Sequence, residues 1–191
     1  LKENPRSSEA LLLQGKIALL GGNGKDAIQA FRTVLKDQPE LAEVYALLGR
    51  AYLMTNDTAL ARESLEKAAL LNPRMVEAHM TLAALDTSSG KFKEARERLD
   101  ALLKLDPNNL QTLSVLLNLQ AAERDWAATD QTLSRARSAG ADSSAADLTE
   151  ARLFQARQEW DRARSAYERV LASHPDAPEP LVALVQLDIK Q

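Results

Sequence analysis

Between residues 45 and 73 the chain reads YALLGRAYLMTNDTALARESLEKAALLNP. Apolar residues recur at helical spacing from 41 to 54 and again from 59 to 71, with Asn56 and Asp57 between the two runs. Pro73 follows the second run. Because proline lacks a backbone donor and disfavours helix in the residue before it, Pro73 ends this run and turns the chain. The segment therefore predicts two successive helices joined by a short turn.

The same arrangement recurs every 34 residues. The prolines at this step are Pro5, Pro39, Pro73, Pro107 and Pro175, and Ala141 occupies the one step without proline. Three further columns keep the step: Ala27, Ala61, Ala95, Thr129 and Ala163; Phe31, Leu65, Leu99, Leu133 and Tyr167; and a third that begins Gly15, Gly49, Ala83. Small side chains let neighbouring helices approach closely, while large ones fill the remaining space. The period therefore predicts an array of packed helix pairs.

The residues at fixed positions of the second repeat are Tyr45, Leu48, Gly49, Tyr52, Ala61, Leu65 and Pro73. Together they resemble the signature of the tetratricopeptide repeat family. The resemblance spans essentially the whole chain, which looks like a piece of a bacterial-type multi-repeat protein. It implies an all-α fold, a right-handed superhelical solenoid of antiparallel helix pairs.

The period divides the chain into five full repeats and two partial ones within a single domain, 1–191. The full repeats are 8–41, 42–75, 76–109, 110–143 and 144–177. Residues 1–7 are expected to be the end of a preceding repeat, and residues 178–191 the first helix of a sixth repeat or a capping helix. Since both ends fall inside the pattern, we expect the natural protein to continue on both sides.

The fifth repeat, 144–177, departs from the pattern in its first helix. Asp147 stands where the other repeats usually have an aromatic residue or leucine, Glu150 stands at a usual leucine, and residues 138–144 replace the proline turn. We expect this first helix to pack less well than the others. Simple repeat drift and a flexible joint or contact edge are both open explanations, because weak packing lowers the free energy of local opening.

Charge and hydropathy disfavour two classes of partner. With 24 Lys and Arg against 27 Asp and Glu, the net charge is -3, so there is no electrostatic excess to neutralise the phosphates of a nucleic acid. No segment approaches the roughly 20 consecutive apolar residues that cross a bilayer. We therefore expect no nucleic acid partner and no direct membrane insertion by this chain. The compartment stays open between the cytoplasm and a bacterial periplasm or envelope.

Residues that could carry catalysis are scarce. The absence of cysteine removes thiol catalysis and cysteine-ligated zinc. His79 and His174 are far apart in the sequence, and neither belongs to a metalloprotease or hydrolase motif. His79 occupies a column of packing residues, so we interpret it as packed and hydrogen-bonded. We predict no catalytic residue, no metal site and no cofactor, and therefore no enzyme.

The family resemblance implies that the first helix of each pair lines the concave side of the superhelix, the family's usual binding surface. The partner-binding residues that it assigns here are Leu12, Leu13, Lys16, Leu47, Arg50, Leu53, Met54, Met80, Asn118 and Arg152. The N-terminal half of this set is apolar, and a contiguous exposed apolar patch marks an interaction site. We expect an amphipathic helix or extended peptide there, with apolar anchors on Leu12, Leu47, Leu53 and Met54 and an acidic group near Lys16 and Arg50.

The sequence thus favours a non-catalytic protein–protein interaction scaffold within a larger protein, binding a peptide or helix. Two alternatives stay open: the repeat region of an envelope protein for exopolysaccharide export or surface sorting, and the substrate-presenting repeat arm of an enzyme such as a glycosyltransferase. The chain could also self-associate through exposed end helices, since the last helix carries uncovered apolar residues.

Overall fold

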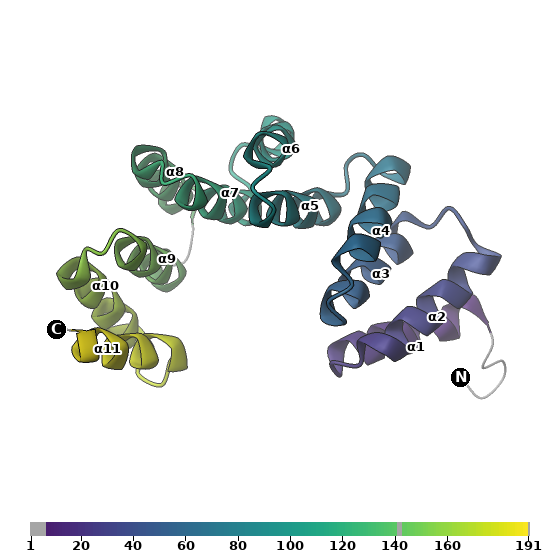
Figure 1. The fold of residues 1–191 in the computed structure, drawn as a ribbon, viewed down its shortest axis with the longest axis horizontal. Coiled ribbons are helices and arrows are strands. Elements are labelled where there is room, and N and C mark those ends of the chain that lie inside the picture. The colour runs from purple at the N-terminus through teal and green to yellow at the C-terminus, as the bar shows by residue number, and fades with distance from the viewer. Residues whose placement is uncertain (1–6, 141–142, 191) are drawn as a thin grey trace. The chain divides into compact units, whose positions relative to one another are not determined.

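The computed structural model describes residues 7–140 and 143–190, and every regular element in these ranges is an α-helix (Figure 1). The helices are α1 (Ser8–Leu20), α2 (Gly24–Asp37), α3 (Ala42–Met54), α4 (Thr58–Leu71), α5 (Val76–Ser88), α6 (Phe92–Leu105), α7 (Leu110–Ala122), α8 (Trp126–Ser138), α9 (Ser143–Ala156), α10 (Trp160–Ser173) and α11 (Pro178–Lys190). The prediction of an all-α fold is confirmed for this part of the chain. Residues 1–6 of the segment 1–7, which is expected to end a preceding repeat, and residues 141–142, in the turn before the fifth repeat, lie outside the described residues.

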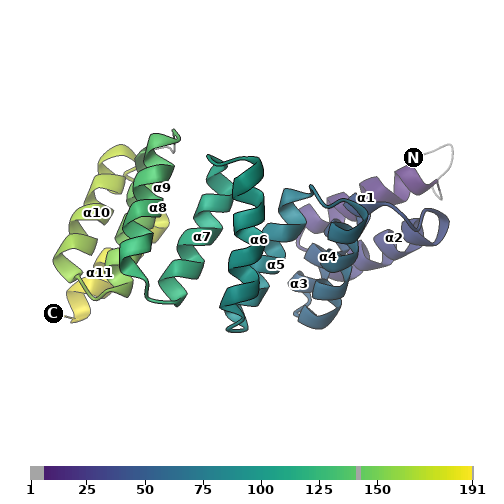
Figure 2. The same ribbon diagram turned by 90° about the horizontal axis from the view of Figure 1, so that it is seen from above.

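The chain divides into two compact units, Leu1–Leu102 and Leu103–Gln191. In the first unit α1 packs on α2 and α3 on α4, which we call the first and second helix pairs. In the second unit α7 packs on α8 and α9 on α10. Figure 2 shows the neighbours within each unit from above. Successive pairs also touch, through α2 with α3, α4 with α5 and α10 with α11. The boundaries of the individual repeats stay a prediction.

The tight contact inside the first two pairs joins a glycine of the first helix to a large residue of the second. A Cβ atom placed on Gly15 would lie 2.4 Å from Phe31 Cε1, and one on Gly49 would lie 2.7 Å from Leu65 Cγ. Phe31 and Leu65 are both 0% exposed. The small column is also 0% exposed at all five positions, Ala27, Ala61, Ala95, Thr129 and Ala163. The helices therefore approach until backbone touches side chain, which only a small residue permits.

One buried carboxylate connects three helices of the first unit. Asp86 of α5 is 1% exposed. It accepts hydrogen bonds from Arg62 Nη1 of α4 at 2.5 Å and from Arg98 Nε of α6 at 2.9 Å. A buried charge is tolerated when it is paired and hydrogen-bonded, and two guanidinium groups meet that condition here. The second helices on either side of α5 are thus held by a polar contact as well as by apolar packing.

The turn inside each helix pair places one residue in the left-handed region of backbone conformation. These residues, with their φ angles, are Gly22 (77°), Asn56 (62°), Gly90 (73°), Arg124 (58°) and Gln158 (62°), which keep the 34-residue step. Glycine adopts this conformation without steric cost and asparagine tolerates it, whereas a long side chain is strained there. The geometry of the helix hairpin, rather than residue preference, therefore fixes the conformation at Arg124 and Gln158.

Replacement of Gln158 by glycine is expected to stabilise the second unit. Gln158→Gly removes a left-handed strain of about 1–2 kcal/mol and loses part of that gain to the greater chain entropy of glycine, so the free energy of unfolding should rise by up to about 1 kcal/mol. Thermal unfolding followed by circular dichroism measures the change. Gln158→Ala keeps a Cβ at the same φ and should give no gain. Equal melting temperatures for the glycine and alanine variants would contradict this account of the turn.

Candidate functional site

The ten residues that the sequence assigns to partner binding all lie on the first helices of pairs. Leu12, Leu13 and Lys16 are on α1, and Leu47, Arg50, Leu53 and Met54 are on α3. Met80 is on α5, Asn118 on α7 and Arg152 on α9. The structure brings the α1 and α3 residues together, because Leu12, Leu47 and Leu53 pack against one core cluster. We call the exposed side of α1 and α3 that carries Leu13, Lys16, Leu20, Arg50 and Met54 the first-helix face.

The four predicted apolar anchors differ in their access to a partner. Leu12, Leu47 and Leu53 are only partly exposed, because they pack against the core that contains Phe31 and Val44. Met54, in contrast, keeps 44% of its surface exposed. Two neighbours outside the set of predicted anchors are also open, Leu13 at 48% and Leu20 at 88%. The apolar surface of this face therefore includes Leu13, Leu20 and Met54.

The basic residues of the first helices are paired with glutamates of the next first helix. Lys16 Nζ lies 2.7 Å from Glu43 Oε1, and Arg50 Nη1 lies 3.3 Å from Glu77 Oε1. In the second unit Arg152 Nε donates to Glu179 Oε1 at 2.6 Å. Each pair spans 27 residues of sequence. At the equivalent positions of the next two repeats the sequence has Ala84 and Gln111, and then Asn118 and Ala145, so no ion pair of this kind forms there. Each pair therefore joins a basic residue to the glutamate 27 positions later, a spacing that single-residue assignment does not reveal.

These ion pairs are too exposed to hold the repeats together. The side chains of Lys16 and Glu43 are 40% and 62% exposed, and an exposed pair contributes about 0–1 kcal/mol. The Arg152 guanidinium, through its hydrogen bonds, holds the pKa of Glu179 below its ordinary value, against the smaller opposing effect of partial burial. The pairs of Lys16 with Glu43 and of Arg50 with Glu77 leave cations and anions side by side on these helices.

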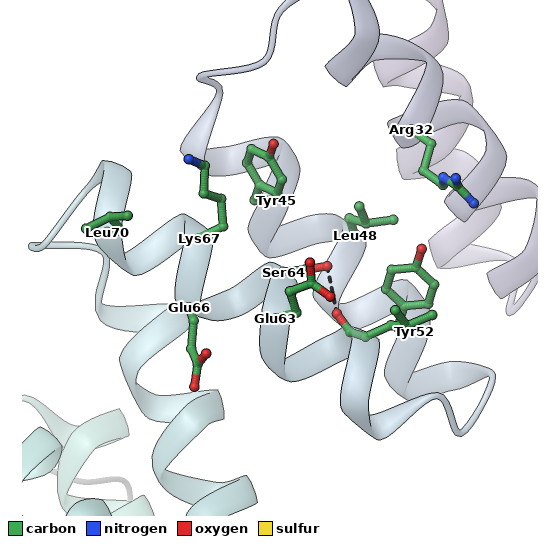
Figure 3. Close-up of a pocket in the computed structure, with 10 residues that line it drawn as sticks. Arg32, Tyr45, Leu48, Tyr52, Glu63, Ser64, Glu66, Lys67 and Leu70 are labelled. Atoms are coloured by element: carbon green, nitrogen blue, oxygen red, sulfur yellow. Dashed lines mark hydrogen bonds between the residues drawn. The ribbon is translucent and has the colours of Figure 1, made fainter.

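A separate cavity of about 660 Å³ opens on the other side of the second pair, between α2 and α4 with α3 beneath (Figure 3). It is lined by Arg32, Tyr45, Leu48, Tyr52, Leu60, Glu63, Ser64, Glu66, Lys67 and Leu70. We call it the second-helix groove. The sequence interpretation missed it, because Tyr45 and Tyr52 match packing positions of the family signature. The sequence signal that could have found it is the pair of leucines, Leu60 and Leu70, on the polar side of the α4 segment.

The two histidines have hydrogen-bond partners in the structure. His79 Nε2 lies 3.1 Å from the carbonyl oxygen of Pro73, and His174 Nδ1 lies 3.0 Å from Ser144 Oγ. Over residues 7–140 and 143–190, no group of three or more histidine, aspartate or glutamate side chains is placed to hold a metal ion. None of the helices described is both long and apolar enough to cross a membrane.

The sequence matches two family models. Residues 28–139, more than half of the 191, match the model of the Cytochrome c-type biogenesis protein H TPR domain. Residues 1–42 and 148–186 match that of the Tetratricopeptide repeat. The chain belongs to the tetratricopeptide repeat family. The family predicted from the sequence is thereby confirmed. No curated protein matches the sequence of this chain.

Solved structures of other tetratricopeptide repeat proteins have the same fold. TTC0263, a thermophilic protein of Thermus thermophilus, aligns with a TM-score of 0.79 at 18% identity, over 96% of this chain and 100% of its own. PilW, a type IV pilus biogenesis factor, aligns with a TM-score of 0.80 at 19% identity, over 96% of this chain and 86% of its own. MamA aligns with a TM-score of 0.60 at 24% identity, over 73% of this chain and 80% of its own. At these identities the similarity concerns the fold alone.

The divergent tetratricopeptide helix α9 is held by charges at positions where its counterparts are mostly leucine. Arg137 Nη2 of α8 lies 2.8 Å from Asp147 Oδ1 and 3.2 Å from Glu150 Oε2. Arg169 of α10 also pairs with both acids. Asp147 and Glu150 are only 18% and 20% exposed, so both are partly withdrawn from water. Weaker packing of α9 was expected because two apolar positions are acidic, and the structure shows that four ionic contacts take their place.

Loss of one arginine from this network should weaken the second unit. Arg169→Met leaves Asp147 and Glu150 with Arg137 as the only remaining cation of the network, and the loss of charge-assisted hydrogen bonds to partly buried acids should lower the free energy of unfolding by about 1–2 kcal/mol. Urea denaturation measures this change in the free energy of unfolding. The control is Arg164→Met, which removes a single contact to the exposed Asp188 and should cost less. A loss no larger than in the control would show that the network does not support α9.

Proposed function

We propose that this chain is a non-catalytic scaffold that holds a segment of a partner protein on the first-helix face of α1 and α3. The observation that carries the proposal is the exposure of Leu13, Leu20 and Met54, at 48%, 88% and 44%, beside two charged pairs. Exposed apolar side chains rimmed by polar groups are typical of protein interaction sites. Membership of the tetratricopeptide repeat family supports the same role.

The face suits a helix or extended segment with alternating apolar and polar groups. Apolar side chains of the segment would cover Leu13, Leu20 and Met54, and polar groups would lie against the pairs of Lys16 with Glu43 and of Arg50 with Glu77. Because exposed ion pairs are weak, a carboxylate of the partner can share Lys16 or Arg50 at little cost. Burial of two or three apolar side chains at about 1.5–3 kcal/mol each, less the cost of association, gives micromolar affinity.

The remaining candidate residues extend the proposal along other first helices. Met80 lies on α5 in the first unit, whereas Asn118 and Arg152 lie on α7 and α9 in the second. Arg152 is paired with Glu179 in the same way as Lys16 with Glu43. We include these residues in the binding surface of their own units. Self-association through α11, which exposes Leu181, Val182 and Val185, stays a prediction.

The second candidate is a more specific function, a role in the assembly of a larger structure. The family model that covers more than half of the chain is named for a cytochrome c-type biogenesis protein, which favours a part in building a multi-component structure over the substrate-presenting arm of an enzyme. An envelope protein for export or surface sorting is one such assembly role. Both assignments are hypotheses that the identity of the partner decides.

Charge placed on the first-helix face should abolish partner binding without unfolding the chain. Leu13→Asp with Met54→Asp adds two desolvated carboxylates to the proposed contact, and capture of the partner should fall at least about tenfold. Crosslinking capture from an extract of the source organism measures it, with circular dichroism as the check on folding. Leu105→Asp, at a leucine 64% exposed on α6, is the matched control and should leave capture intact.

The variants separate the outcomes. A partner captured by the natural chain and the Leu105→Asp control but lost from the double variant supports the proposal. Equal capture by all three proteins, or no specific capture by the natural chain, would overturn it.

A further inference from the structure

Two leucines of α4 stand at positions where the other second helices carry charged or small residues. The positions equivalent to Leu60 hold Asp26, Glu94, Ala128 and Arg162, and those equivalent to Leu70 hold Lys36, Lys104, Ser138 and Ala172. Leu60 is 44% exposed and Leu70 is 73% exposed. Both line the second-helix groove. The second pair therefore has large apolar side chains at two points of a single cavity, where the other pairs have charged or small side chains.

The floor of this groove is aromatic. Tyr45 and Tyr52 project from α3 toward the opening between α2 and α4 (Figure 3). No other repeat has aromatic residues at both positions: the equivalents are Leu11, His79, Leu113 and Asp147 for the first, and Ala18, Asp86, Gln120 and Phe154 for the second. Tyrosine rings offer a large rigid contact area at low cost in conformational entropy. The floor is therefore suited to hold one apolar side chain of a ligand.

The cations of the groove are unpaired, unlike those of the first-helix face. In the described ranges, neither the guanidinium of Arg32 on α2 nor the ammonium of Lys67 on α4 has an ion-pair or hydrogen-bond partner. Glu63 is likewise unpaired, whereas Glu66 points away from the two tyrosines in Figure 3 and lies 4.0 Å from Arg62. Of the four charged side chains that line the groove, two cations and one anion are therefore unpaired, which favours an acidic ligand, and Glu63 can accept a backbone N–H from it.

A groove at equivalent positions exists in the second unit, but two of its arginines already pair with glutamates of the same unit. A cavity of about 460 Å³ is lined there by Glu150, Phe154, Arg162 and Arg169, which correspond to Leu48, Tyr52, Leu60 and Lys67 at three times the repeat length. Arg169 pairs with Glu150, and Arg162 Nη1 lies 2.5 Å from Glu159 Oε2. The cavity is thus a recurrent feature of the architecture, whereas the open cations and leucines belong to the second pair.

We propose that the second-helix groove docks a short, extended, acidic segment of a partner protein. One phenylalanine or leucine side chain of the segment lies on Tyr45 and Tyr52 between Leu60 and Leu70, and its carboxylates pair with Arg32 and Lys67. This site is separate from the first-helix face, so a partner can be held on either side of α3.

The test uses three acetylated and amidated hexapeptides as probes. The first is Glu-Asp-Phe-Leu-Asp-Glu, the second has lysine at its four acidic positions, and the third has serine in place of phenylalanine and leucine. Backbone amide chemical shifts of the chain are followed during titration. The first probe should shift amides of α2, α3 and α4 around Tyr45 and Tyr52 and bind at least about tenfold more tightly than the other two. Its affinity should fall as salt rises from about 50 mM to about 500 mM.

Two variants locate the binding. Leu60→Glu with Leu70→Lys gives the groove the residues that α6 carries at Glu94 and Lys104, so the chain should fold and bind the first probe at least about tenfold more weakly. Leu13→Asp with Met54→Asp, on the first-helix face, should leave this binding unchanged. The two proposals are therefore tested separately. Loss of support for partner binding on the first-helix face would not change the peptide titration of the second-helix groove, and a negative titration would not change the capture experiment.

Three results would overturn the proposal. They are equal affinity for the acidic and lysine probes, binding of the acidic probe that survives Leu60→Glu with Leu70→Lys, and absence of any saturable shift up to about 1 mM probe.

Discussion

In the first and second helix pairs, the contact between a glycine of the first helix and a large residue of the second is the constraint on which the packing of the neighbouring helices depends. Gly15 admits the ring of Phe31, and Gly49 admits Leu65, at distances that leave no room for a Cβ. Because the two helices of a pair meet along their buried sides, the remaining sides are free for other contacts. The exposed leucines and charges of α1, α3 and α4 become available only because this packing is complete beneath them.

The sequence predicts the fold well, because its signal is local and repeated. Proline at five of the six steps, small residues at one column and large residues at another follow directly from helix packing and chain turning, and all of them are visible in residue type. The left-handed turn residues are less visible in the sequence. Glycine at positions 22 and 90 indicates a positive φ, whereas Arg124 and Gln158 adopt a positive φ because the hairpin requires it. Residue type alone does not predict strain that the surrounding structure imposes.

The candidate site is predicted only in outline. Helix periodicity and family resemblance place Leu12, Leu47 and Lys16 on first helices, but their access depends on contacts between neighbouring helices. Leu12 and Leu47 are partly covered by the core, and Lys16 is paired with Glu43. The second-helix groove was missed for the complementary reason, since signature tyrosines can pack and also line a cavity. Comparison of Leu60 and Leu70 with their counterparts in other repeats is the sequence signal that recovers it.

The central claim is that steric fit between Gly49 and Leu65 sets the approach of α3 to α4, and a double-mutant cycle tests it most directly. Gly49→Ala should lower the free energy of unfolding by about 1–3 kcal/mol in the natural chain, because the added methyl group overpacks against Leu65. In a Leu65→Ala background the same change should be neutral, or stabilising by up to about 1 kcal/mol through helix propensity. A coupling energy of about 1 kcal/mol or more is therefore predicted. An equal effect of Gly49→Ala in both backgrounds would contradict the account.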